Sequence, residues 1–210
     1  MDDSIKKELA YLNTLVSDNK RQVISRVIQN RTNYLTVALE NITQPHNGSA
    51  VIRSCDIFGV QNLHVIEQMS KFKADVNIAK GANKWIDIHT YATTADAITN
   101  LKKQGYRIVA TTPHERGYSI KDLPIDKKIA LFFGTEITGL SDQMLEQADD
   151  FVTIPMFGFT ESFNISVSVA LCLYELINKI RALKLDWQLT PNERELLQLT
   201  WLKRVLHISK

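Results

Sequence analysis

The stretch LFFGTEITGLSDQMLEQADDFVTIPMFGFTESFNISVSVALCLY, residues 131–174, decides the fold that the sequence predicts. The apolar run at residues 129–133 has the length and composition of a buried strand, and residues 151–154 form a second short strand. A long apolar helix begins after them, near Ser162 and Asn164. Open α/β sheets bind their ligands beyond the carboxyl ends of the strands. We therefore expect the active site in the two polar loops that follow these strands.

Strands alternate with helices through the rest of the chain, which is typical of a mostly parallel sheet covered by helices on both faces. The further strands that we expect are residues 34–39, 62–66, 85–89 and 106–110. The further helices that we expect are two within residues 4–30, one that has Asn47 as its N-cap and ends at Gly59, one at residues 94–103 and one from Pro191. The sequence thus predicts an α/β domain at residues 32–180, a helical arm at residues 1–31 and a helical extension at residues 181–210.

The composition is that of a globular protein of the reducing cytosol. The chain has 210 residues, of which 44% are hydrophobic, and this is enough to bury a sizeable core. Its two cysteines, Cys55 and Cys172, lie in apolar helical patterns, so we expect neither a disulfide framework nor a zinc site. The sequence contains no secretory signal and no apolar run of about 18 residues. We therefore expect a cytoplasmic protein that does not span a membrane.

Basic residues gather towards both ends of the chain. Residues 1–31 contain six Lys or Arg and four Asp or Glu, whereas residues 171–210 contain seven and four. With a net charge of +2 for the whole chain, the ends carry +2 and +3 and the middle carries −3. Basic ends around a mildly acidic middle indicate arms that meet a polyanion. Ordinary solvated helix faces are the alternative, and charge alone does not separate the two interpretations.

Several common chemistries lack their motifs in this sequence. It contains no Gly-x-Gly-x-x-Gly, no phosphate-binding loop that ends in Gly-Lys-Ser/Thr, no Gly-x-Ser-x-Gly and no His-Glu-x-x-His. We therefore expect no hydride transfer, no ATP hydrolysis, no acyl transfer and no metal site. What remains near the predicted strand ends is one arginine, one glutamate, two asparagines and one serine, namely Arg53, Glu136, Asn47, Asn164 and Ser162. Such a set suits the recognition of an adenosyl group and a phosphate, with the electrophile carried by a cofactor.

Three motifs carry a resemblance to a known family. They read Asn47-GSAVI-Arg53 followed by Phe58-Gly59, then Gly134-T-Glu136-IT-Gly139-LS, and then Ile154-PMFG followed by Ser162, Asn164 and Ser166. In this order they resemble the motifs of the TrmH family, within the SPOUT superfamily of RNA methyltransferases. The resemblance covers roughly residues 32–180, and three motifs in register with the intervening strands make it specific.

The resemblance implies a ribose 2′-O-methyltransferase that uses S-adenosyl-methionine, has a C-terminal trefoil knot and acts on RNA as a homodimer. The helical arms resemble those of the branch that methylates guanosine 18 in the D-loop of tRNA. The catalytic residues that it implies are Arg53, Asn47, Glu136, Ser162 and Asn164. The residues that it implies around the cofactor are Thr111, Gly134, Ile154 and Phe163. Arg53 takes the ribose hydroxyl proton or, since a guanidinium is a poor base, stabilises the developing alkoxide.

Alternatives stay open for the reaction and for single residues. The same reaction on ribosomal RNA or at another tRNA position is one alternative, and a non-catalytic RNA-binding protein that keeps the knot is another. The helical arms argue against the minimal wobble-position enzymes, and the lack of a separate small RNA-binding domain before residue 32 argues against the ribosomal branch. Ser162 and Asn164 also suit plain helix caps. Trp201 suits packing better than stacking on a base.

Overall fold

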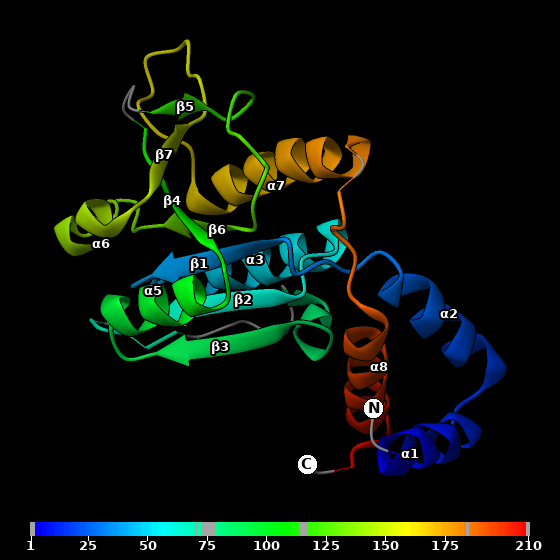
Figure 1. Cartoon of the computed structure of the whole chain (residues 1–210). Coiled ribbons are helices and arrows are strands. Elements are labelled where there is room, and N and C mark those ends of the chain that lie inside the picture. Colours follow the sequence, from blue (N-terminus) through cyan, green and yellow to red (C-terminus); the bar gives the residue numbers. More distant parts are fainter. Residues whose placement is uncertain (1–2, 70, 73–78, 114–116, 184, 209–210) are drawn as a thin grey trace. The chain divides into compact units, whose positions relative to one another are not determined.

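Two units make up the chain, residues 1–32 with 187–210 and residues 33–186. The computed structural model describes residues 3–69, 71–72, 79–113, 117–183 and 185–208. The larger unit is built on a seven-stranded sheet with the order β3-β2-β1-β6-β4-β7-β5, in which every neighbouring pair is parallel (Figure 1). The strands are β1 Leu35–Glu40, β2 Asn62–Ile66, β3 Asp87–Tyr91, β4 Arg107–Thr111, β5 Tyr118–Ser119, β6 Ile129–Phe133 and β7 Asp150–Thr153.

Helices cover both faces of this sheet, as the sequence predicts. They are α3 Pro45–Phe58, α5 Thr94–Lys103, α6 Asp142–Gln147 and α7 Ile165–Ala182, with a short 3-10 helix, η1, at Ala82–Lys84. Helices α5 and α6 pack on one face through a cluster that includes Ile98, Leu101, Met144 and Phe132. Since side chains alternate along a strand, Ile129, Leu131 and Phe133 face the other side, where α3 and α7 pack together. The predicted α/β fold is confirmed.

Three further strands, β1, β4 and β7, are each shifted by one residue from the predicted bounds, and local chemistry explains two other differences. Helix α3 begins at Pro45, so Asn47 lies in its first turn, and the prediction of Asn47 as the N-cap is wrong. Proline is favoured at the first helical position because its fixed φ suits the helix and the missing N–H has no partner there. The third strand starts two residues later than predicted, at Asp87, because Trp85 ends the 3-10 turn η1. Gly59 ends α3 as predicted, in the left-handed conformation with φ 81°.

The second unit consists of the terminal helices α1 Asp3–Thr14, α2 Asp18–Ile28 and α8 Pro191–Leu206. Trp201 of α8 is 1% exposed, and the guanidinium of Arg31 lies 5.1 Å from its ring centroid. Lys203 pairs with Glu8 at 2.8 Å, and Thr190 and Glu193 form a capping box at the start of α8. Trp201 therefore packs inside this unit, which confirms the packing interpretation. Within the described residues, no helix is both long and apolar enough to cross a membrane.

Candidate active site

Three polar side chains reach the carboxyl edge of the sheet from three different elements. Asn47 lies in the first turn of α3, which follows β1, and Glu136 lies in the loop after β6. Asn164 is the N-cap of α7, which follows β7, and its side chain accepts a hydrogen bond from Ser166 N. Because all these strands are parallel, their carboxyl ends meet at one edge. Each of the three predicted motifs thus contributes one side chain here.

The three side chains form one hydrogen-bonded network. Asn47 Nδ2 donates to Glu136 Oε1 at 3.1 Å, and Asn164 Nδ2 donates to the same oxygen at 2.6 Å. Asn164 Nδ2 also lies 3.1 Å from Asn47 Oδ1 and donates to it. Asn47 is 2% exposed, whereas Glu136 and Asn164 are exposed. We call the three residues the amide–carboxylate network; its buried end is fixed, and its other end faces solvent where a substrate can reach it.

The loop that carries Glu136 is closed by backbone geometry. Thr135 and Gly139 exchange two backbone hydrogen bonds of 3.0 Å, and Gly139 has φ 69°. A Cβ at residue 134 would lie 2.1 Å from the carbonyl carbon of Gly139, so only glycine permits this close approach. The glycines of the second motif therefore shape a tight loop with Glu136 near its tip.

Arg53 and Ser162 are not part of the amide–carboxylate network. Arg53 is exposed on α3, and six residues from Asn47 it is turned by about 240° around the helix. Ser162 is exposed in the loop before α7. Among the described residues, neither side chain forms a hydrogen bond or an ion pair. Both are therefore available to a ligand, and the structure does not bring them to Glu136.

The four residues predicted around the cofactor lie at or beyond the ends of β4, β6 and β7. Thr111 ends β4, Gly134 follows β6, and Ile154 follows β7. Phe163 is partly exposed and precedes the N-cap of α7. In the described part of the chain, the backbone of residues 155–163 makes no hydrogen bond, so its amides and carbonyls are free for a ligand.

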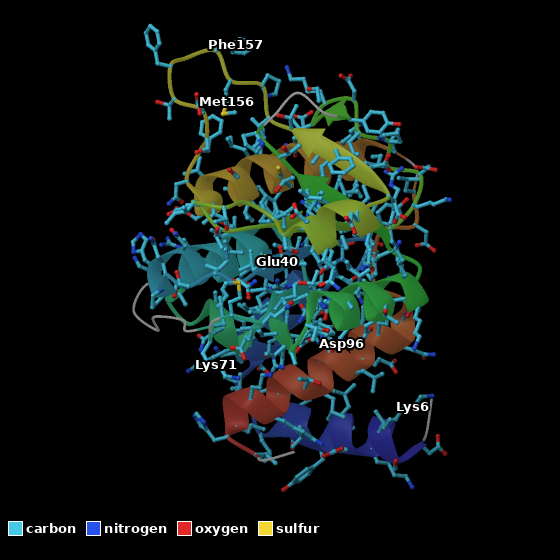
Figure 2. The ribbon with its side chains drawn as sticks, turned by 90° about the vertical axis from the view of Figure 1, so that its left-hand side faces the viewer. Lys6, Glu40, Lys71, Asp96, Met156 and Phe157 are labelled. Atoms are coloured by element: carbon cyan, nitrogen blue, oxygen red, sulfur yellow. The ribbon has the colours of Figure 1, made fainter. Side chains whose placement is uncertain are left out.

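This segment fits an adenosyl group. An adenine needs hydrogen bonds to its edge and apolar contact with its faces, and free backbone groups beside apolar side chains provide both. Phe157 in this segment is 98% exposed, and Ile137 in the loop after β6 is 95% exposed. Figure 2 shows Met156 and Phe157 at the end of a loop that extends away from the sheet. By contrast, no group of three His, Cys, Asp or Glu side chains within the described residues is placed to hold a metal ion.

Two further residues support the amide–carboxylate network: Ser166, which the third motif contains but to which sequence reasoning gave no role, and Gln44, which sequence reasoning missed. Gln44 Oε1 accepts a hydrogen bond of 3.0 Å from Asn47 Nδ2, and Ser166 Oγ donates to Asn164 Oδ1 at 2.6 Å. Both residues hold the two asparagine side chains in one orientation. The position of Ser166, two residues after a capping asparagine, is a signal that could have found it. Gln44 carries no such signal beyond its place before Pro45.

Comparison with known proteins decides the family. Residues 34–174 match the model of the SpoU rRNA Methylase family. The chain belongs to the SpoU rRNA methylase family. The chain is 41% identical over 206 residues to the tRNA (guanosine(18)-2'-O)-methyltransferase of Borreliella burgdorferi, and the match covers 98% of this chain and 94% of that protein. The protein of the same name from Thermus thermophilus is 33% identical over 159 residues, covering 76% and 82%.

Solved structures agree with this assignment. The A. aeolicus TrmH/SpoU tRNA modifying enzyme superposes on this chain with a TM-score of 0.81 and 26% identity, covering 92% of this chain and 98% of that chain. The predicted resemblance to the TrmH family is therefore confirmed. The structural neighbours of this chain also imply the α/β-knot class. Without the family resemblance, sequence patterns would not have predicted a knot, because true knots are rare in proteins.

Proposed function

We propose that this protein transfers a methyl group from S-adenosyl-methionine to the ribose 2′-oxygen of guanosine 18 in tRNA. The amide–carboxylate network is the observation that carries the proposal, because it joins Asn47, Glu136 and Asn164 from three motifs at the edge where α/β sheets bind ligands. The substrate follows from the B. burgdorferi relative, whose name states this reaction and which is similar over 98% of this chain.

The residues around the strand ends suit their proposed roles in holding the cofactor. Residues 154–163 and Gly134 offer backbone groups to the adenosyl moiety, Thr111 borders them at the end of β4, and Phe163 offers an apolar wall. S-adenosyl-methionine supplies the methyl group as an electrophile. The protein therefore has to bind the RNA, orient one ribose hydroxyl and exclude water.

We assign the charged and polar side chains to the RNA. The exposed guanidinium of Arg53 binds a phosphate and stabilises the oxyanion that develops on the ribose. Asn47, Glu136 and Asn164 orient each other and, with Ser162, the bound nucleotide. Glu136 is the one carboxylate in this network, so it is placed to accept a hydrogen bond from the ribose hydroxyl.

We also propose the roles of the two units, the cellular location and the oligomeric state. Residues 32–180 act as the methyltransferase domain, and residues 1–31 and 181–210 act as helical extensions that bind tRNA. The protein is a cytoplasmic homodimer, and α7 forms its interface. Val167, Leu171 and Tyr174 are exposed at helical spacing on α7, and Ile57 is exposed on the neighbouring helix α3.

A methyl-transfer assay tests the reaction and its position. Unmodified tRNA transcripts are incubated with the protein and radiolabelled S-adenosyl-methionine, and the methylated nucleotide is mapped. A transcript with a 2′-deoxy guanosine at position 18 is the matched control, because it keeps the base and removes only the acceptor oxygen. We expect incorporation into the first transcript and none into the second.

Other results would lead to other conclusions. Equal incorporation into both transcripts, or into ribosomal RNA alone, would show the same chemistry on another nucleotide. RNA binding without methyl transfer, in a protein that binds S-adenosyl-methionine, would favour a non-catalytic RNA-binding protein. Calorimetry that detects no S-adenosyl-methionine binding would remove the proposed cofactor.

A further inference from the structure

Glu40 is a buried carboxylate with an unusual set of partners. It is the last residue of β1 and is 2% exposed, and Figure 2 labels its position among the surrounding side chains. Its Oε1 accepts hydrogen bonds from Thr94 Oγ1 at 2.5 Å and from Ser141 Oγ at 2.7 Å. Its Oε2 accepts one from Ser141 N at 2.8 Å. No described lysine, arginine or histidine forms an ion pair with it.

The position of Glu40 follows from strand alternation. Ala38 faces the α5 and α6 side of the sheet, so Glu40, two residues later, faces the same side at the carboxyl end of β1. Helix α5 begins there with Thr94, and α6 begins there after its N-cap Ser141. A buried carboxylate is costly unless donors satisfy it, and these two helix starts supply three of them.

These contacts connect Glu40 to the loop that carries Glu136 and to the chain segment that leads to Asn47. Ser141 ends the loop 134–141 that carries Glu136, and the other end of this loop is continuous with β6. Along the chain, Glu40 lies seven residues before Asn47 of α3, whose Nδ2 donates to Glu136 Oε1 at 3.1 Å. Glu40 thus ties the base of the Glu136 loop to the strand that leads to Asn47.

We propose that Glu40 is a positioning residue for Glu136. Its carboxylate holds Ser141 and thereby keeps the loop 134–141 in the position in which Glu136 accepts hydrogen bonds from Asn47 and Asn164. Glu40 itself is buried under the site and touches no substrate. Without the carboxylate, the backbone N–H and the hydroxyl of Ser141 lose their acceptor, and this end of the loop is held only by the burial of Leu140 and by the start of α6. The inference rests on the proposed function for its activity readout.

Two substitutions of Glu40 separate positioning from simple loss of stability. Glu40→Gln keeps an oxygen for Ser141 N, and its amide can donate to the two hydroxyl groups, which are able to turn; we expect kcat close to that of the parent. Glu40→Ala removes every contact. We expect its kcat to fall by about 100-fold, as for a misplacement of about 1 Å, with a smaller change in KM for either substrate.

A double-mutant cycle with Glu136 tests the route of the effect. If Glu40 acts through Glu136, then Glu40→Ala costs little further activity in a Glu136→Ala background under single-turnover conditions. Asp149→Ala is the control: its exposed carboxylate pairs with Lys102 at 3.2 Å and also accepts a backbone hydrogen bond, from Ile108 N at 2.8 Å, but at the opposite end of the strands. We expect this control to lower Tm and to leave kcat unchanged.

Hydrogen–deuterium exchange gives a readout that does not depend on activity. We expect peptides that span residues 134–141 to exchange faster in Glu40→Ala than in the parent, and to exchange as in the parent in Glu40→Gln and Asp149→Ala. Unchanged exchange in Glu40→Ala would overturn the inference, as would additive losses in the cycle. Absence of methyl transfer by the parent would overturn the proposed function instead, and the exchange measurement would still decide whether Glu40 anchors the loop.

Discussion

Arg53 carries the positive charge that the proposed reaction depends on, and its exposed position allows its effect on activity to be separated from its effect on stability. It is exposed on α3, while the buried side of that helix is formed by Val51, Ile52 and Cys55. Arg53→Ala should therefore change stability by no more than about 0.5 kcal/mol. If the guanidinium acts mainly in the transition state, kcat should fall by about 100-fold while the Kd for S-adenosyl-methionine stays constant. Steady-state kinetics and calorimetry on the folded variant measure both quantities.

Arg53→Lys is the control for charge alone. An ammonium group keeps the charge but lacks the planar fork that binds a phosphate with two hydrogen bonds, so we expect little recovery of activity. An Arg53→Ala protein with the parental rate would remove this residue from the mechanism. Parental activity in Arg53→Lys would show that a point charge is enough.

His64 gives the fold a predicted sensitivity to acid. Its ring is stacked on that of His89 with centroids 4.9 Å apart, and burial first and His89 second lower the pKa of His64 from 6.5 to about 3. Between these values the unfolded chain binds a proton that the folded protein does not. The free energy of unfolding should therefore fall as pH decreases below 6.5, by about 1.4 kcal/mol per pH unit from this residue.

Urea unfolding at several pH values between 7 and 4 tests this. His64→Phe keeps an aromatic ring of similar size and cannot bind a proton, so its stability should depend less steeply on pH. His46→Phe, at an exposed position, is the matched control and should keep the parental slope. The same slope in His64→Phe and in the parent would show that acid sensitivity arises elsewhere.

At the scale of elements, Asn164 has two functions that can be separated. Its Oδ1 caps α7, and its Nδ2 donates to Glu136 and Asn47. Serine caps a helix as well as asparagine does but has no amide donor. Asn164→Ser should therefore keep the parental stability and lose activity. Asn164→Ala should lose activity and also about 1 kcal/mol of stability. Thermal unfolding and the methyl-transfer assay on both variants distinguish these outcomes, and an active Asn164→Ser protein would reduce this residue to a cap.

Most elements could be predicted because their signals are local. The strands 62–66 and 129–133 and the helix 94–103 have the predicted bounds, since apolar runs, caps and glycines define them. The two-residue strand β5 was missed because Tyr118–Ser119 is too short to show alternation. Contacts between distant segments leave no local signal. The hydrogen bonds of Glu40 join residues 54 and 101 positions away in the chain, so only the fold reveals them.

At the scale of the whole molecule, the terminal helices offer the RNA a limited set of cations. Lys203 pairs with Glu8, Arg21 pairs with Asp18, and Arg31 is buried. Lys7 and Arg26 are exposed, and their side chains form no ion pair with any described residue. Arg26 also lines an open groove of about 490 Å³ together with Asn13, Gln22 and Gln198. This unit therefore suits contact with phosphates through a few free side chains.

Neutralisation of Lys7 and Arg26 tests this surface. Lys7→Gln with Arg26→Gln should weaken tRNA binding and reduce the salt dependence of log K by up to about 0.9 per removed cation, because fewer counterions are released. Lys103→Gln with Lys127→Gln removes the same charge from the larger unit and is the control. Binding titrations at several salt concentrations measure the slope. An equal loss in both double variants would reduce the effect to net charge.

The proposed homodimer connects the exposed face of α7 to activity. Leu171 lies on that face between Val167 and Tyr174, and Ile57 of α3, four residues after Arg53, is 67% exposed. Four residues apart on a helix, Arg53 and Ile57 share one side, so a partner seated on this face would also lie near Arg53.

Leu171→Glu places a charge in the contact and should yield a folded monomer with little activity. Leu183→Glu, at a similarly exposed leucine at the end of α7, should remain dimeric and active. Sedimentation velocity and the methyl-transfer assay decide the question: an active monomer would separate catalysis from assembly, and a dimer that survives Leu171→Glu would place the interface on another surface.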